Sequence, residues 1–201
     1  MKTMKKWRLL LLIIIIGITS IIILPQRISA KAYSPNKDIW DDLEGDDSLN
    51  LVHLINNNVF ALGFARYADD HLRSDQVMTF DFSKVSKRRY ILKWIGISGM
   101  PGDNTQSVSE LSKWLFGVNT SNVPRIDGEV GGSYPSIGMW DRLNGLYQVG
   151  KNKYKYTKTL YMINEESGDS PDTLGFVEYT LKKKPGSHYG WIVKKAKVTK
   201  S

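Results

Sequence analysis

Residues 153–163 read KYKYTKTLYMI, residues 174–184 read LGFVEYTLKKK and residues 188–198 read HYGWIVKKAKV. In each stretch apolar or aromatic side chains alternate with polar or charged ones, as Lys153, Tyr154 and Lys155 do. Because successive side chains of a strand point to opposite faces of a sheet, this period of two predicts strands with one buried and one wet face. Pro185-Gly186-Ser187 is a turn signal between the last two stretches. We therefore predict a C-terminal antiparallel meander.

Helical spacing dominates the region well before the meander. Apolar residues recur every three or four positions from Ser48 to about Leu72, which predicts a helix. The run Asn56-Asn57-Asn58 is an alternative break that would divide this helix in two. Two apolar runs follow, 77–82 and 90–98, and the polar segment between them predicts a β-hairpin.

A second helix signal lies between the hairpin and the meander. Ser107-Val108-Ser109-Glu110 is a capping box, which favours a short helix starting there. Residues 119–138 contain four glycines and predict a long loop. Helices, a hairpin, a short helix and a meander together predict an α+β domain, with a curved antiparallel sheet packed on helices. This order of elements is similar to that of NTF2-like domains, although no sequence motif supports the similarity.

The first 32 residues have the composition of a membrane-targeting segment. A basic start, Met1–Arg8, precedes Leu9–Leu24, a run of 16 residues without a charge, and Ala30-Lys31-Ala32 follows. These are the parts of a secretory signal. As a helix the apolar run would be about 24 Å long against about 30 Å of hydrocarbon, so cleavage before Tyr33 and retention as an N-terminal anchor are both open. In either case residues 33–201 are expected outside the cytoplasm.

The net charge of +8 comes mainly from this targeting segment. Residues 1–32 hold six of the 28 basic residues and none of the 20 acidic ones, which leaves a net charge of +2 for the remainder. A nearly neutral remainder does not favour nucleic acid as a partner. Acidic residues crowd into 33–47, which predicts a flexible acidic lead-in to a single domain at 48–201. The chain has no cysteine, so thiol catalysis and thiolate metal sites are excluded.

Near-matches to known motifs do not support catalysis or a cofactor. Residues 145–151 match most of a phosphate-binding loop, but Asn152 replaces the required Ser or Thr and the next residues alternate like a strand, so a hairpin turn is expected. Ser98 resembles the serine of a nucleophile elbow, but Met100 replaces the required glycine. The three histidines lack the spacing of a metal site, and the acidic stretch fails the pattern of a Ca²⁺ loop.

Two groups of residues are the candidate binding sites. The first group combines acids and aromatic residues in and after the glycine-rich stretch, which suits a carbohydrate: Asp127, Glu129, Tyr134, Trp140 and Asp141. The second group would form a basic, aromatic strand face that suits an anionic wall polymer: Lys153, Tyr154, Lys155 and Tyr156.

These observations predict a secreted or outward-facing binding domain of a bacterial cell envelope, without catalytic activity, metal or cofactor. Its expected partner is an anionic wall polymer, a glycan or another envelope protein. One alternative is a membrane-anchored accessory subunit of an envelope or secretion complex, held in the membrane through residues 9–24. Another alternative is a glycan- or peptide-directed hydrolase that uses the acids near the loop.

Overall fold

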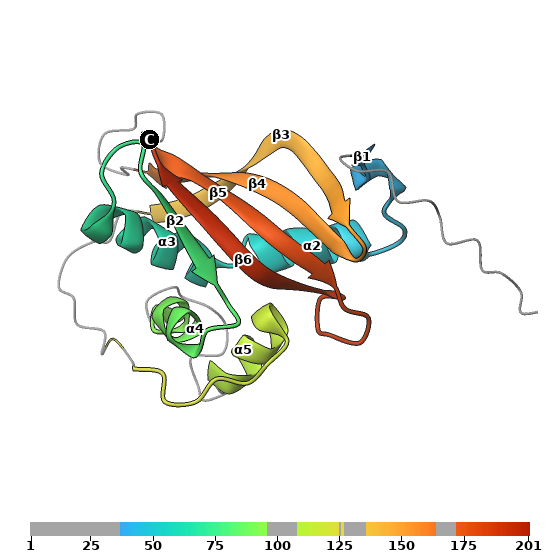
Figure 1. The fold of residues 1–201 in the computed structure, drawn as a ribbon, viewed down its shortest axis with the longest axis horizontal. Helices are drawn as coiled ribbons and strands as arrows, with labels where there is room; N and C mark the ends of the chain where they lie inside the picture. Colours follow the sequence, from blue (N-terminus) through green and yellow to red (C-terminus); the bar gives the residue numbers. More distant parts are fainter. Residues whose placement is uncertain (1–36, 96–107, 125, 127–135, 164–171) are drawn as a thin grey trace, which may run out of the picture. The chain divides into compact units, whose positions relative to one another are not determined.

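Four long strands form most of the sheet in a computed structural model, which describes residues 37–95, 108–124, 126, 136–163 and 172–201. They are β3 (Ser136–Gly150), β4 (Lys153–Ile163), β5 (Asp172–Lys183) and β6 (Trp191–Lys200). The short strands β1 (Lys37–Asp38) and β2 (Val77–Asp81) complete the sheet order β1-β3-β4-β5-β6-β2, in which all neighbours are antiparallel (Figure 1). The predicted meander is therefore confirmed, and β4 has the predicted bounds.

The strand β3 was missed in the sequence, and the predicted loop over 119–138 is wrong from residue 136 onwards. Glycines interrupt the apolar pattern of β3 and imitate turn signals. Gly145 has a φ of +66° at an irregularity in the pairing of β3 with β4, and a Cβ there would overlap the Asp38 carboxylate. These glycines therefore let the chain bend and let side chains approach, without ending the strand.

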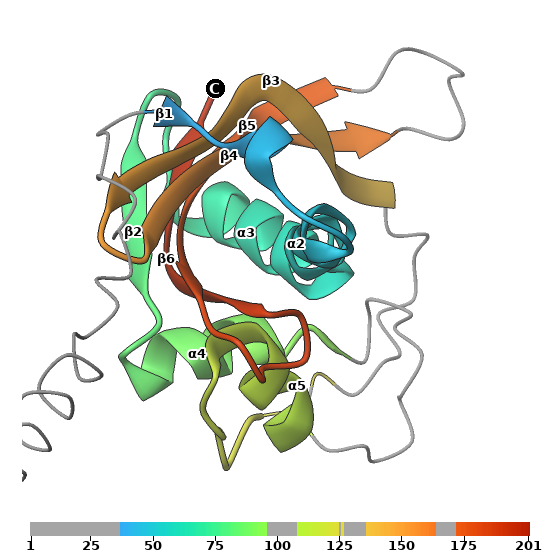
Figure 2. The same ribbon diagram turned by 90° about the vertical axis from the view of Figure 1, so that its right-hand side faces the viewer.

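Two helices, α2 (Asp47–Ile55) and α3 (Asn58–His71), replace one continuous helix. The Asn57 side chain accepts a hydrogen bond from the Val59 amide at 3.1 Å, so the asparagine run starts a new helix. The predicted alternative of a divided helix is thus confirmed. Figure 2 shows the strands curving around α2 and α3, as predicted for a curved sheet packed on helices.

The predicted β-hairpin is wrong, because its second half begins as a helix, α4 (Val85–Leu92). β2 pairs with β6 at the sheet edge. In α4 the side chains of Arg88, Ile91 and Leu92 are buried at helical spacing, and a short apolar run alone does not distinguish a buried strand from a buried helix. Residues 96–98 of the predicted strand lie outside the described residues.

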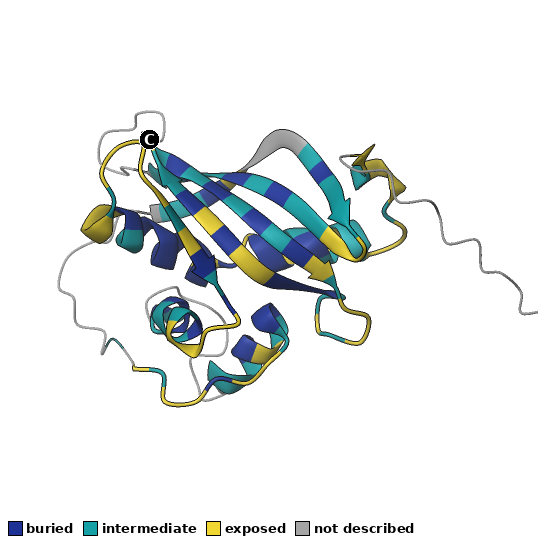
Figure 3. Ribbon diagram, viewed as in Figure 1, coloured by how far each residue is buried: buried dark blue, intermediate teal, exposed yellow. Residues whose placement is uncertain are grey.

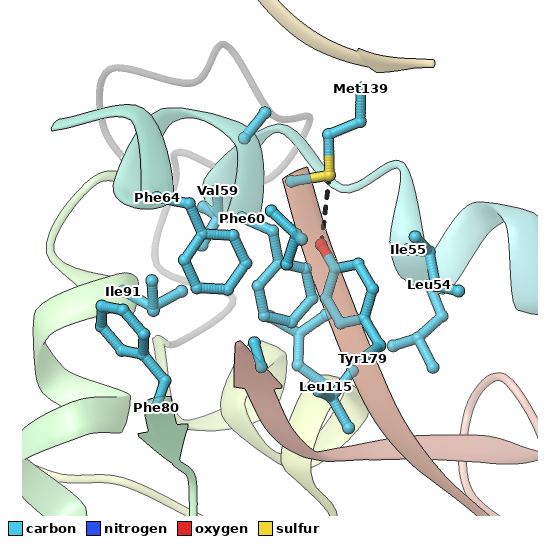
Figure 4. Packing of buried hydrophobic residues seen from close by; sticks show 14 of the residues in the cluster. Leu54, Ile55, Val59, Phe60, Phe64, Phe80, Ile91, Leu115, Met139 and Tyr179 are labelled. Carbon is cyan, nitrogen blue, oxygen red and sulfur yellow. Dashed lines mark hydrogen bonds between the residues drawn. The ribbon is translucent and has the colours of Figure 1, made fainter. Parts of the chain in front are cut away.

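The predicted short helix is confirmed as α5 (Val108–Phe116), although its predicted cap, Ser107, is outside the described residues. Aromatic side chains from the helices and the sheet fill the core beneath the strands, as Figure 4 shows. Phe60 lies 5.7 Å from Phe64 and 5.8 Å from Tyr179 between ring centroids. The Tyr179 hydroxyl donates a hydrogen bond to the Met139 sulfur at 3.1 Å.

The acidic stretch after residue 36 contains secondary structure, and the flexibility of the lead-in stays a prediction. β1 pairs with β3, a 3₁₀ helix η1 (Trp40–Asp42) follows, and the Trp40 ring stacks on Tyr156 at 5.5 Å. All described residues belong to one compact unit, Ser34–Ser201. The predicted targeting segment lies outside the described residues, and within them no helix is long and apolar enough to cross a membrane.

Candidate functional site

The first predicted group of site residues is described only in part. Asp127, Glu129 and Tyr134 lie outside the described residues. Trp140 lies in β3 with 47% of its surface exposed. Asp141 pairs with Lys158 of β4 through the backbone, and the position of its side chain is not described. The hydrolase alternative, which needs these carboxylates, therefore stays a prediction.

The second predicted group is divided between the two faces of the sheet. Tyr156 is buried on the inner face, and Tyr154 packs edge-on against Trp191 at 5.0 Å. Lys153 and Lys155 alternate with them and so point to the opposite face, as the burial pattern of the strands in Figure 3 illustrates. The two tyrosines and the two lysines are therefore not brought together on one surface.

Two aromatic rings lie in contact on the face of the sheet that is turned away from α2 and α3, which we call the outer face. Trp140 of β3 stacks on Tyr161 of β4 with 4.0 Å between ring centroids and 24° between planes. Phe176 of β5 is half-buried on the same face, and Thr159 pairs with both Trp140 and Phe176 across the strands. Trp140 and Phe176 are two strands apart, which is about 10 Å.

Gly138 makes the stacked pair possible, because a Cβ at this position would overlap the Tyr161 hydroxyl. The Tyr161 ring can therefore lie across the β3 backbone. Neither Tyr161 nor Phe176 was among the predicted site residues. They could have been identified from their position on the solvent-facing side of the alternating pattern, because a large aromatic residue there suggests a function.

Lysine side chains continue this outer face beside the aromatic rings. Lys197 lies one row of side chains from Phe176, since it pairs with Glu178, and such rows are about 7 Å apart. Lys155 and Lys195 lie in the following row, on either side of Thr180. All three lysines are at least partly exposed.

Two described acids on this face have basic neighbours. Glu178 forms an ion pair with Lys155 at 3.0 Å, and Asp81 lies 3.8 Å from the Lys195 ammonium. Hydrogen bonds from Ser83, followed by the charge of Lys195, hold the pKa of Asp81 below its ordinary value, so this carboxylate stays ionised. The three lysines of these two rows therefore outnumber the two carboxylates, Glu178 and Asp81, that pair with them.

The other motifs of the sequence gain no support from the structure. Most of the segment that resembles a phosphate-binding loop, residues 145–150, is the end of β3, and only its last residue, Lys151, lies with Asn152 in the expected turn to β4, where Asn152 has a φ of +57°. Ser98 lies outside the described residues. His71 stacks on Tyr67 and His188 stacks on Trp114, at ring distances of 4.4 and 4.0 Å. Within the described ranges no three His, Asp or Glu side chains gather as a metal site would require.

No protein-family model matches the chain, and no curated protein sequence or solved structure matches it. The similarity to NTF2-like domains therefore remains one of element order.

Proposed function

We propose that this chain is an exported binding domain that holds an anionic glycan chain on the outer face of its sheet. The observation that carries the proposal is the stacked pair of Trp140 and Tyr161, with Trp140 47% exposed. An aromatic ring that is exposed to water lacks the favourable free energy of burial that the core aromatic residues have. A ligand that covers the ring would supply this free energy, which gives a physical reason for its exposed position.

A sugar polymer suits these rings better than a compact apolar ligand. The C–H face of a pyranose packs flat on an aromatic ring, and its hydroxyl groups remain free to hydrogen-bond at the rim. Thr159 lies between Trp140 and Phe176 and offers a hydroxyl between the two rings. An extended chain lying across the strands could contact both rings and this hydroxyl.

The lysines support an anionic chain over a neutral one. Lys197, Lys155 and Lys195 begin one row away from the rings, so a polymer that contacts Phe176 can reach them. Attraction between exposed charges is screened by salt, and this part of the binding should therefore weaken as ionic strength rises. Binding without bond cleavage is proposed, since Glu178 and Asp81 on this face are both paired with lysines.

The test is a pelleting assay of the full-length chain in detergent, with purified Gram-positive cell-wall sacculi as the probe. Parallel samples contain sacculi stripped of their anionic polymer by acid, and chitin as a neutral glycan. Trp140→Ala should weaken binding to all three about five- to tenfold, which corresponds to the loss of one aromatic contact. Lys195→Gln with Lys197→Gln should weaken binding to intact sacculi only, and should reduce its salt dependence.

Val118→Ala is the matched control, because Val118 is an exposed apolar residue, 44% accessible, that follows α5. It should bind like the parent chain. Equal binding by the parent chain and Trp140→Ala would overturn the proposed glycan surface. Binding that depends on the lysines but not on Trp140 would leave only a charged face.

Location requires a separate measurement, the intact mass and N-terminal residue of the chain produced in a Gram-positive host. A chain that starts at Tyr33 in the medium supports a released binding domain. A chain that starts at Met1 in the membrane fraction supports the anchored form, for which the accessory-subunit alternative predicts partner proteins in the same membrane.

A further inference from the structure

A second surface, remote from the aromatic rings, has the dimensions of a ligand site. An open groove of about 700 Å³ lies between α4 and the segment 121–124, in which Asn122 has a φ of +53°. Pockets for small molecules commonly have volumes of about 300–1,000 Å³. The described residues that line the groove are Ser86, Arg89, Tyr90, Lys93, Asn122, Val123 and Pro124.

Both walls of the groove are held in place by hydrogen bonds. Arg89 Nε donates to the Ser121 carbonyl oxygen at 2.9 Å, which ties α4 directly to the opposite wall. Next to it, the buried Arg88 Nε donates to the Thr120 hydroxyl at 2.8 Å. A groove with two fixed walls loses little conformational entropy when a ligand enters.

The charge of the groove is positive on one side. Arg89 and Lys93 are the charged residues among the described lining, and they are four residues apart, so their side chains are neighbours on α4. The Lys93 ammonium lies over the rings of Tyr90 and Trp94, at 4.3 and 4.7 Å from their centroids. In the described part of the chain neither cation forms an ion pair, and the hydrogen bond of Arg89 leaves its two terminal nitrogens available.

The remaining lining is largely apolar. The Tyr90 ring, Val123 and Pro124 offer a surface for a flat organic group beside the two cations. A ligand that fits both parts carries an anion at one end and a ring at the other. A phosphate monoester has a charge of about −1.5 to −2 at neutral pH, which matches two cations, and guanidinium nitrogens are suited to phosphate oxygens.

We propose that this groove binds a small organic phosphate, with the phosphate between Arg89 and Lys93 and the organic group against Tyr90, Val123 and Pro124. The site is independent of the proposed glycan surface, because it uses other elements and another ligand. Without a ligand, the same two cations would only position segment 121–124 and interact with the carboxyl end of α4. A ligand site and a purely structural role of these cations differ in one respect. A ligand site should distinguish between ligands, whereas a purely structural role does not require this.

The experiment is calorimetric titration of the full-length chain with phenyl phosphate, and with inorganic phosphate and phenol as its two halves. Phenyl phosphate should bind about tenfold or more tightly than either half, because only the ester uses both parts of the groove. Arg89→Gln and Lys93→Gln should each weaken its binding about tenfold.

Lys87→Gln is the matched control, since Lys87 also lies on α4 but its ammonium lies over Tyr67 and Phe80 and it is not among the residues that line the groove. It should change the affinity less than about twofold. Circular dichroism must show that each variant is folded. If Arg89→Gln fails this check, Lys93→Gln alone decides, because among the described residues the Lys93 ammonium contacts the rings of Tyr90 and Trp94.

Three results would overturn the proposal. The first is the absence of phenyl phosphate binding at millimolar concentrations. The second is phenol binding as tight as that of phenyl phosphate, which would make the groove an apolar site. The third is equal weakening by Lys87→Gln and Lys93→Gln, which would reduce the effect to diffuse attraction of an anion.

Discussion

Arg88 is a buried cation whose replacement should destabilise the fold. It is 9% exposed, and its guanidinium donates three hydrogen bonds. Nη1 bonds to the carbonyl oxygens of Phe82 and Ser83 at 2.6 and 2.9 Å, and Nε bonds to the Thr120 hydroxyl at 2.8 Å. The residue thus ties α4 to the end of β2 and to the segment that follows α5.

The expected loss of unfolding free energy for Arg88→Met depends on which hydrogen bonds each acceptor of the guanidinium would keep. Methionine keeps most of the apolar stem, so the cavity term is small. The Phe82 carbonyl would be left unpaired in the interior, the Ser83 carbonyl is partly accessible to water, and Thr120 keeps its 2.7 Å hydrogen bond with Ser112. One buried unpaired carbonyl, one partly solvated carbonyl and one weakened network give about 2–4 kcal/mol, after relief of the buried charge.

Urea unfolding followed by circular dichroism measures this loss, and a thermal scan checks it. For a unit of the size of Ser34–Ser201, 1 kcal/mol corresponds to roughly 2–4 °C, so the midpoint should fall by roughly 5–15 °C. Arg89→Met is the control, because the side chain of Arg89, next in the chain, is only partly buried and donates one hydrogen bond, to the Ser121 carbonyl. A loss below about 1 kcal/mol is expected there. If Arg88→Met were as stable as the control, the buried network would not contribute as argued.

Three further changes test other parts of the structure. Gly145→Ala should destabilise by about 1–3 kcal/mol, because it places a Cβ at a φ of +66° and against the Asp38 carboxylate; the urea midpoint measures this. Asp81→Asn should destabilise at pH 7, and this loss of stability should shrink as pH falls below about 3.9. The folded pKa of Asp81 is lowered by hydrogen bonds from Ser83, so its stabilisation is present above the unfolded pKa of about 3.9 and disappears as pH falls through the folded value. Burial raises the pKa of Tyr179 well above its ordinary value, so stability should fall as pH rises above about 10, and Tyr179→Phe should reduce this fall.

Each of these three predictions has an experimental outcome that would contradict its physical reason. Gly45→Ala shares a positive φ, +57°, but its Cβ would meet no atom within 4 Å. If Gly45→Ala lost as much stability as Gly145→Ala, backbone strain alone would explain the effect. A destabilisation by Asp81→Asn that does not shrink as pH falls from 7 to well below about 3.9 would show that the shape of the side chain, and not its charge, matters there. An unchanged alkaline loss in Tyr179→Phe would assign the effect to other groups.

The sequence predicted strands well where apolar and polar side chains alternate between the two faces of the sheet. β4 has the predicted bounds because Lys153 to Ile163 contains no glycine and mostly alternates, although Lys158 is buried and Tyr161 lies on the outer face. β3 was missed because Gly138 and Gly145 have structural roles that depend on residues far away in the chain, Tyr161 and Asp38. A strand that is shaped by long-range contacts carries turn residues inside it, and local pattern rules then read it as a loop.

The candidate surfaces depend even more on contacts between distant residues. Trp140 was among the predicted site residues, but its partner Tyr161 follows only from the register of β3 with β4. The predicted lysines and tyrosines of β4 are separated for the same reason that the strand was recognised, since alternation sends neighbours to opposite faces. The groove beside α4 joins Arg89 to Ser121 across 32 residues, through a helix whose residues were predicted as a hairpin connection and the start of a strand.

The two proposed surfaces can be tested against each other, because they lie on different elements. Figures 1 and 2 both place α4 on one side of α2 and α3 and β3 on the other side. Trp140→Ala should therefore leave phenyl phosphate binding unchanged, and Lys93→Gln should leave binding to sacculi unchanged. Contacts that share no residue usually contribute additively, so the double variant should lose each activity to the same extent as its single variant. If each substitution instead weakened both activities in folded protein, the two ligands would share one surface, and the separate assignments of β3 and α4 would both be wrong.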